Sequence, residues 1–393
     1  MRLLLLLLCA ALAGCAEFGA FKELANSVQS LVSGTDNADP PNELKPLEPA
    51  VKMTVLWTAT VGDGYDGQVV NLVPAVTEER IFAAERNGEV QARGRLKGEL
   101  LWSVDTDLEL SAGPVVAGDR LLLGTSDGEL LALNVADGAQ LWKTELSSEL
   151  LALPRVAKDS VVVRTTDGRL SAVDQKTGRL RWSYERSVPP LLVRGLGSPA
   201  IAGDLVLDGF GGGKLIALSL ADGKTVWEAT VAIPHGRSEV ERLVEMDADP
   251  LVKGDTVYVS GYQGGVAAVS LKDGEVLWRQ EHVSTSHGLA ADRRSLFLSD
   301  ANSDLWQLDM GNGADLWKQS DLHMRRLTVP ALIKDRLVVG DLEGYVHLLA
   351  KEDGSLVGRV RVGSEPIRAT PVVFDDIIYV YTGGGILAAI ALE

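Results

Sequence analysis

The stretch Leu133-Asn-Val-Ala-Asp137-Gly138-Ala-Gln-Leu141-Trp142-Lys143 decides the fold, because near-copies of it recur along the chain. Each copy ends in a tryptophan, except the eighth, where Gly358 takes its place. A period of about 40 residues that carries a tryptophan indicates the blades of a β-propeller, each built from four strands. Seven of the eight tryptophans mark this period: Trp57, Trp102, Trp142, Trp182, Trp227, Trp278 and Trp317.

Each repeat also has the turn chemistry of short antiparallel strands. Between Pro114 and Trp142, apolar runs are bounded by turn residues, and Asp127-Gly128 and Asp137-Gly138 are hairpin pairs, since glycine supplies the positive φ of a tight turn. A proline opens the first run of most copies, which suits the start of a strand, where no hydrogen-bond donor is lost. The sequence therefore predicts an all-β fold of eight four-stranded antiparallel blades.

The two ends of the repeat region are predicted to share one blade. The chain finishes with three strand-like runs, from Thr370 to Phe374, Ile377 to Tyr381 and Ile386 to Ala391, and lacks a fourth. The segment Met53-Thr-Val-Leu-Trp57-Thr supplies the missing strand. Residues 53–393 then form one eight-bladed propeller, and pairing of the N-terminal strand hides two sheet edges that would otherwise be open.

The recurring tryptophans have two interpretations. An aromatic ring can be a platform for a ligand, or it can fill the space between neighbouring blades. Recurrence at one place in every repeat favours the structural role. Gly358 then predicts one blade junction that packs differently.

The N-terminus has the pattern of a secreted, lipidated protein. Residues 1–14 read as a signal peptide, with a charged start and an apolar core that ends in small residues. The ending Leu12-Ala13-Gly14-Cys15 resembles the bacterial lipobox, which implies a lipid on the Cys15 sulfur and retention at the outer membrane. The alternative is ordinary signal cleavage beside an incidental cysteine. Residues 15–52, rich in proline, are predicted to be a tether that holds the propeller away from the bilayer.

Composition excludes several classes of function. The formal net charge of −16 gives no basic surface for nucleic acid. The only cysteines are Cys9 and Cys15, so the mature domain can hold neither a disulfide nor a cysteine-based zinc site. The five histidines show no metal-ligand spacing, and no nucleophile elbow or phosphate-binding loop is present. We expect no catalytic residue, metal or cofactor.

Two repeats are longer than the others, and insertions in repeat proteins map to loops on one face that often binds a partner. The first insertion contains Leu191, Val193 and Arg194 and is apolar with one cation. The second runs from Pro234 to Asp249 and is rich in charge. Together they predict a docking patch, although an apolar loop can also pack back onto the ring.

The repeat consensus Leu-x-Ala-Leu-x-x-x-Asp-Gly-x-x-Leu-Trp, seen for example between Leu131 and Trp142, resembles that of pyrroloquinoline-quinone dehydrogenases. This likeness supports the fold only. Those enzymes carry a cysteine pair, metal-ligating groups and larger blades that this chain does not show.

The lipobox, the Pro-rich tether, the eight repeats and the long acidic loop together resemble the BamB family, propeller lipoproteins of the outer-membrane β-barrel assembly machinery. The resemblance implies docking on the periplasmic domains of BamA, the barrel-forming subunit. Leu191, Val193 and Arg194 would then supply apolar and cationic contacts, and Glu245 and Asp247 the acidic ones. The family more often has leucine at position 193 and aspartate at position 245.

Two hypotheses of function follow. The first is a non-catalytic lipoprotein scaffold that faces the periplasm, binds BamA and assists the folding and insertion of outer-membrane barrel proteins, with unfolded clients as further partners. The second is a lipid-anchored quinoprotein-like enzyme or a propeller that binds a small ligand.

Overall fold

The structure, a computed structural model, describes residues 39–65, 67–186, 197–234 and 244–393. The chain divides into two compact units, Met1–Pro40 and Pro41–Glu393, and the second contains every strand described below. The predicted signal peptide and Cys15 lie outside the described residues. Among the described residues, no helix has the length and apolar character of a membrane span.

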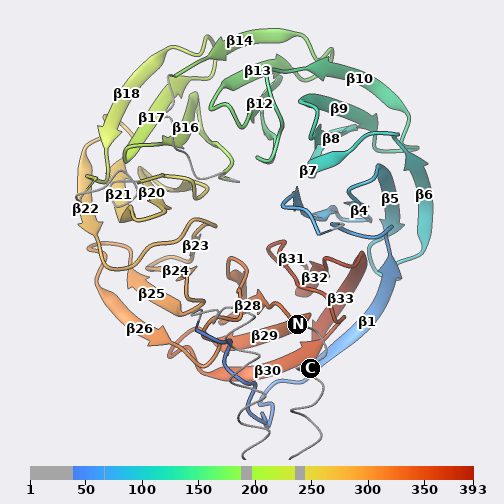
Figure 1. Ribbon diagram of the computed structural model, residues 1–393, viewed down its shortest axis with the longest axis vertical. Helices are drawn as coiled ribbons and strands as arrows, with labels where there is room; N and C mark the ends of the chain where they lie inside the picture. The colour runs from blue at the N-terminus through green and yellow to red at the C-terminus, as the bar shows by residue number, and fades with distance from the viewer. Residues whose placement is uncertain (1–38, 66, 187–196, 235–243) are drawn as a thin grey trace, which may run out of the picture. The chain divides into compact units, whose positions relative to one another are not determined.

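Eight sheets surround a central axis in the second unit, and the predicted eight-bladed propeller is confirmed (Figure 1). Blades 1 to 4 contain β3 (Ala75–Val76), β4 (Arg80–Ala84), β5 (Glu89–Gly94) and β6 (Leu100–Asp105); β7 (Leu110–Ala117), β8 (Arg120–Thr125), β9 (Glu129–Asn134) and β10 (Gln140–Glu145); β11 (Arg155–Ala157), β12 (Ser160–Arg164), β13 (Leu170–Asp174) and β14 (Leu180–Tyr184); and β15 (Ala200–Ala202), β16 (Leu205–Phe210), β17 (Lys214–Ser219) and β18 (Thr225–Thr230).

The remaining blades repeat this order from the innermost to the outermost strand. Blades 5 to 8 contain β19 (Leu251–Lys253), β20 (Thr256–Gly261), β21 (Gly265–Ser270) and β22 (Val276–Gln280); β23 (Ala290–Ala291), β24 (Ser295–Ser299), β25 (Leu305–Asp309) and β26 (Asp315–Gln319); β27 (Ala331–Ile333), β28 (Arg336–Gly340), β29 (Tyr345–Ala350) and β30 (Leu356–Arg361); and β31 (Val372–Phe374), β32 (Ile377–Tyr381), β33 (Ile386–Leu392) and β1 (Met53–Thr60).

Blade 8 joins the two ends of the repeat region, as the sequence predicts. β1 pairs antiparallel with β33 from Met53 opposite Leu392 to Thr60 opposite Ile386. Just beyond this pairing, the amide of Glu393 donates to the carbonyl of Lys52 at 2.8 Å, and the reverse bond measures 3.3 Å. The N-terminal strand therefore closes the ring as the outermost strand of the last blade.

The seven tryptophans share one geometry within the ring, which supports their structural interpretation. Each of the seven lies on an outermost strand and donates its indole N–H to a backbone carbonyl of the next blade; Trp182, for example, donates to Leu220 at 2.8 Å. The acceptors are the carbonyls of Arg95, Val135, Gln175, Leu220, Leu271, Met310 and Lys351. The rings thus link neighbouring blades by a hydrogen bond as well as by apolar contact.

The junction at Gly358 packs differently, as expected. A Cβ atom on Gly358 would lie 2.8 Å from the carbonyl oxygen of Val51, so a tryptophan has no room there. The amide of Val51 donates to the carbonyl of Val357 at 2.9 Å. At this junction the incoming chain takes the space that an indole ring fills at the other seven.

Residues 41–52, which we call the strap, lie along the ring before β1 begins. The Asn42 amide donates to the carbonyl of His323 at 3.0 Å, and Arg325 Nη1 donates to the carbonyl of Asn42 at 3.0 Å. Lys45 forms an ion pair with Asp321 at 3.3 Å. This end of the predicted tether therefore packs on blades 6 and 7.

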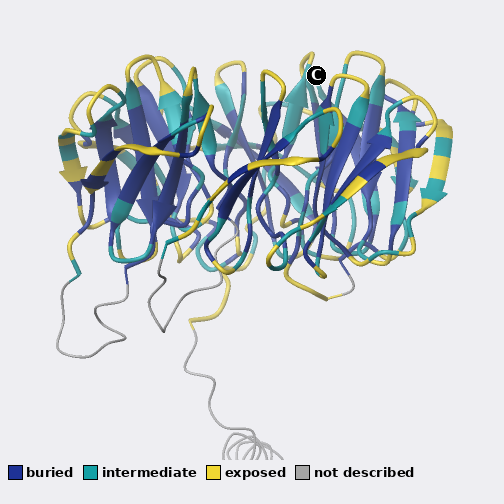
Figure 2. Ribbon diagram, turned by 90° about the horizontal axis from the view of Figure 1, so that it is seen from above, coloured by how far each residue is buried: buried dark blue, intermediate teal, exposed yellow. Residues whose placement is uncertain are grey.

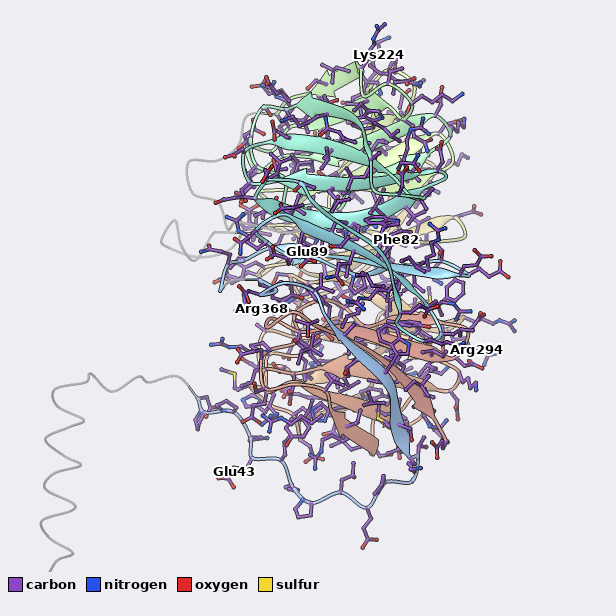
Figure 3. All side chains as sticks on the ribbon, turned by 90° about the vertical axis from the view of Figure 1, so that its right-hand side faces the viewer. Glu43, Phe82, Glu89, Lys224, Arg294 and Arg368 are labelled. Atoms are coloured by element: carbon purple, nitrogen blue, oxygen red, sulfur yellow. The ribbon has the colours of Figure 1, made fainter. Side chains whose placement is uncertain are left out.

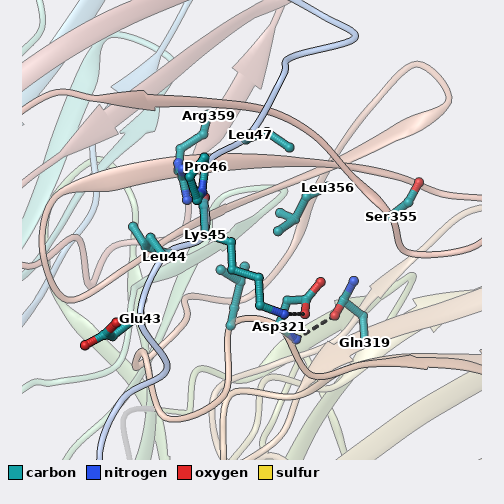
Figure 4. Close-up of a pocket in the computed structure, with 11 residues that line it drawn as sticks. Glu43, Leu44, Lys45, Pro46, Leu47, Gln319, Asp321, Ser355, Leu356 and Arg359 are labelled. Carbon is teal, nitrogen blue, oxygen red and sulfur yellow. Dashed lines mark hydrogen bonds and ion pairs between the residues drawn. The ribbon is translucent and has the colours of Figure 1, made fainter.

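The strap covers a small hollow, shown in Figure 4. A cavity of about 260 Å³ lies between residues 43–47 and side chains that include Gln319 and Leu356. Leu44 packs against the apolar cluster of blades 6 and 7 beside Trp317. The strap thus covers an apolar seam that would otherwise face solvent.

The core runs through the middle strands of every blade, which are drawn as buried in Figure 2. Their apolar side chains form clusters between adjacent sheets, such as the one that joins blades 4 and 5. One element was not predicted. β2 (Asn71–Leu72) adds to blade 2 in parallel with β7, which makes that sheet five-stranded.

Candidate functional site

The two longest connections join the outermost strand of one blade to the innermost strand of the next. One runs from β14 to β15 and the other from β18 to β19. Connections of this type begin at the same end of successive blades, so their described ends lie at one face of the ring, which we call the loop face. Leu191, Val193 and Arg194 fall within residues 187–196, outside the described residues.

The end of the second connection, residues 244–249, runs inward along blades 4 and 5. The amide of Gly212 donates to the carbonyl of Val244 at 2.8 Å, and the amide of Glu245 donates to the carbonyl of Tyr262 at 3.2 Å. Glu245 thereby forms isolated bridges with both neighbouring hairpins. The segment fills the groove between two blades with regular backbone contacts.

Glycines in the neighbouring strands make room for this segment. A Cβ on Gly209 would lie 1.9 Å from the carbonyl oxygen of Met246, and one on Gly261 would lie 1.7 Å from that of Glu245. No side chain fits at such separations, so both positions require glycine. These two glycines are a sequence signal for the close approach that the sequence analysis did not use.

Both predicted acidic contacts are buried in this groove. Glu245 is 4% exposed and Asp247 is 5% exposed. The Asp247 carboxylate accepts the backbone N–H of Tyr262 at 3.1 Å. We expected these side chains on a charged surface loop, whereas the structure uses them inside the ring, beside the buried Asp208.

Burial dominates the electrostatics of this carboxylate group. Desolvation raises the pKa of Glu245 to about 7, and repulsion from Asp247 adds to the rise. Burial likewise raises the pKa values of Asp247 and Asp208 to about 6. Arg164 opposes these shifts and donates to Asp208 at 3.2 Å. One arginine thus faces three buried carboxyl groups.

Some of these oxygens are unpaired among the described residues. Asp208 Oδ2 and Glu245 Oε1 are buried, and neither has a hydrogen-bond partner there. An unpaired buried acceptor carries a desolvation cost of about 1–3 kcal/mol. The arrangement favours a cationic or hydrogen-bond-donating neighbour.

Asp249 links the described ends of the two long connections. Its carboxylate accepts the backbone N–H of Ser198 at 2.6 Å and pairs with Arg155 at 2.5 Å. Arg155 also donates to the carbonyl of Pro199 at 3.0 Å. This bridge holds the end of the first connection against the end of the second. Sequence analysis placed Asp249 in the charged loop without this role, because contacts between distant repeats leave no local pattern.

In the part of the chain that the structure describes, no three His, Cys, Asp or Glu side chains are arranged to hold a metal ion.

Comparison with known proteins identifies the family. The sequence profile described as outer membrane protein assembly factor BamB matches residues 86–319 and 313–393. The chain belongs to the BamB family. A BamB described as an outer membrane protein assembly factor from Alkalilimnicola ehrlichii is 54% identical over 89% of this chain and 91% of that protein. BamB of Pseudomonas aeruginosa is 47% identical over 96% of this chain and 99% of its own length.

Solved structures agree with this assignment. The crystal structure of BamB from Moraxella catarrhalis covers 86% of this chain and 99% of its own, with a TM-score of 0.76 and 26% identity. A quinohemoprotein alcohol dehydrogenase from Comamonas testosteroni reaches a TM-score of 0.69 at 12% identity, covering 89% of this chain and 78% of its own. The second likeness shows the fold alone.

Proposed function

We propose that this chain is an outer membrane protein assembly factor, a non-catalytic scaffold that binds the periplasmic domains of BamA and assists barrel proteins as they fold and insert. Its support is the similarity to BamB proteins over nearly the whole chain. The structural observation that supports the proposal is the Asp249 bridge, because it holds the described ends of the two long connections next to each other.

The location follows from the N-terminus. We propose that Cys15 carries a lipid that anchors the protein in the outer membrane and that the propeller faces the periplasm. The strap supports this arrangement, since Asn42 is fixed to the connection between β26 and β27, which belongs to the loop face.

Within that surface we assign separate roles to the predicted residues. Leu191 and Val193 supply apolar contact and Arg194 pairs with a carboxylate of BamA. Glu245 and Asp247 are buried in the groove and hold residues 244–249 there. Their negative charge favours cationic groups at the surface over the groove. Unfolded barrel chains are further partners.

A titration of purified BamA periplasmic domains tests the proposal. Arg194→Ala should weaken binding by about 2–5 kcal/mol if the pair is desolvated, because a buried carboxylate loses its partner. The melting temperature should hardly change, since surface substitutions alter stability by about 0.5 kcal/mol or less.

Arg294→Ala is the matched control, because this exposed arginine lies in blade 6. It should bind BamA like the wild type. If Arg194→Ala also bound like the wild type but melted several degrees lower, the first connection would be structural and the docking assignment wrong.

A further inference from the structure

A second hollow is lined by residues outside the two long connections. Its volume is about 400 Å³, and five separate parts of the ring line it: residues 69–72 before blade 1, His287 before blade 6, Asp300, Ala301 and Ser303 in blade 6, residues 326–328 before blade 7 and residues 368–369 before blade 8. Ligand pockets in proteins span roughly 300–1,000 Å³. The hollow is thus large enough for a small ligand or a few residues of a chain.

Apolar side chains form much of its lining. Val69 is 54% exposed and is one of several large apolar side chains that face solvent. Leu72 and Leu327 lie beneath the surface at 1% and 5% exposure and give the hollow an apolar floor. An exposed valine above such a floor favours an apolar occupant.

Two arginines supply charge at the same place. Arg326 and Arg368 line the hollow, both are exposed, and neither forms an ion pair with any described residue. Arg368 Nη1 donates to the carbonyl of Gln68 at 3.2 Å, which holds it over residues 69–72. Arg326 adopts φ +52°, a left-handed conformation that costs about 1–2 kcal/mol for a residue with a side chain. Such strain is concentrated at functional sites.

The one carboxylate in the lining does not neutralise these arginines by direct contact. Asp300 accepts the indole N–H of Trp306 and the backbone N–H groups of Asn302 and Asp304, each at 2.9 Å. Its oxygens are therefore committed to the turn between β24 and β25. In a chain of net charge −16, two guanidinium groups that form no ion pair within the described residues make this hollow a local site for an anion.

The lining also contains the last strand of a sheet, in which Asn71 is half-buried and Leu72 is covered. β2 (Asn71–Leu72) is the last strand of the sheet ordered β10-β9-β8-β7-β2, and among the described strands it pairs with β7 alone. An edge strand presents backbone donors and acceptors to which an extended peptide can add. A lipid acid would use the apolar floor and the arginines but has no backbone to pair with this edge.

We propose that this hollow binds the C-terminal end of an extended, apolar polypeptide. The backbone of the peptide lies along β2, an apolar side chain covers the floor beside Val69, and the terminal carboxylate pairs with Arg326 and Arg368. The inference rests on the proposed function, which brings unfolded barrel proteins to this chain. Figure 3 places Arg368 toward the side of the ring where Glu43 lies and Arg294 toward the opposite side.

Fluorescence anisotropy with the purified, full-length mature protein tests the site. The probe is an N-terminally labelled octapeptide of alternating apolar and polar residues that ends in leucine, and its C-terminally amidated twin is the comparison. The free acid should bind about tenfold or more tightly than the amide, since hydrogen bonds between charged groups are the strong ones. Arg326→Ala and Arg368→Ala should each reduce that difference, and Val69→Asp should weaken both peptides.

Arg294→Ala should leave both affinities unchanged, and melting curves should show that the variants are folded. Equal binding of acid and amide would overturn the proposal, as would loss of binding in Arg294→Ala to the same degree as in Arg368→Ala. Displacement of the probe by decanoate without any preference for the free acid would assign the hollow to a lipid instead. BamA is absent from the titration, so its outcome is independent of the docking test.

Discussion

The contact between a glycine and a tryptophan at seven of the eight blade junctions explains why both residues recur. Gly223 has φ +70°, and a Cβ added to it would lie 2.6 Å from Cε3 of Trp182 in the preceding blade. The same arrangement relates Gly98 to Trp57 and Gly274 to Trp227. The turn glycine of one blade is therefore the surface on which the indole ring of the preceding blade rests.

Substitutions at two glycines of blade 4 distinguish the effect of the tryptophan contact on stability from the effect of backbone strain. Gly223→Ala should destabilise the protein by about 2–4 kcal/mol, because it adds a clash with Trp182 to the cost of a left-handed residue. Gly203 has φ +59° with nothing within 4 Å of an added Cβ, so Gly203→Ala should cost only about 1 kcal/mol. Urea unfolding measures both. Equal losses in the two variants would show that the tryptophan contact is unimportant.

The buried carboxyl group of Glu245 makes stability depend on pH. Its pKa is raised from 4.5 to about 7 in the folded protein. Between these values the folded state holds more protons than the unfolded state, so the contribution of Glu245 to stability falls as pH rises from about 4.5 to 7. Glu245→Gln should remove up to about 2 kcal/mol of that dependence, since each unit of pKa shift corresponds to about 1.4 kcal/mol.

The measurement compares unfolding free energies of the wild type and Glu245→Gln at pH 5 and pH 7.5. The wild type should lose more stability than the variant over this interval. His347 has an opposite effect, because burial lowers its pKa, but it is present in both proteins and its contribution cancels. Identical pH dependence in the two proteins would show that folding does not raise the pKa of Glu245.

Among the elements, the strap and β1 make separable contributions. The strap adds the Arg325 bond to Asn42, the Lys45 ion pair and the packing of Leu44. β1 supplies an entire paired edge of blade 8. Loss of the strap should therefore weaken a ring that stays closed, whereas loss of β1 should open it.

Three truncations of a soluble secreted form test this distinction. Deletion of residues 16–40 should leave the melting temperature unchanged, and deletion of residues 16–50 should lower it by several degrees, because an apolar seam becomes exposed. Deletion through Thr60 should abolish cooperative unfolding, since it exposes two sheet edges. A melting temperature for the longest deletion equal to that of the second would contradict ring closure by β1.

Some elements were predictable because their signals are local. The Asp-Gly pairs, the tryptophan spacing and the absence of a fourth strand after Ile386 are each visible in a few residues, and together they predicted eight blades and the closing strand. β2 was missed because two residues show no alternation of apolar and polar side chains. The strap was interpreted as part of a free tether because a proline-rich segment has the same composition whether or not it packs.

The carboxylates of the groove illustrate a different limit. Glu245 and Asp247 stand in a run of charged residues, which usually indicates a solvated loop. Their burial depends on Gly209 and Gly261, which come from two other strands and admit the segment between blades. Arg164 and Asp208 likewise come from separate blades, so only the folded ring brings the four ionisable groups together.

At the scale of the whole ring, each blade contacts its two neighbours in nearly the same way. Seven junctions share the tryptophan contact, and the eighth replaces it with the backbone of Val51. A ring of this kind distributes its stability over its junctions, and terminal blades with open edges are absent from it. A substitution that weakens any one junction should therefore lower the stability of the whole ring.

The reciprocal hydrogen bonds between Lys52 and Glu393 place the first and last residues of the ring side by side. The polypeptide therefore runs once around the propeller and returns to the residue beside its start. A short linker between these residues would allow the chain to be cut at an exposed Asp-Gly turn of another blade without loss of any sheet pairing. The fold therefore does not depend on which blade contains the chain ends. We expect the ring to form from a circularly permuted order of blades.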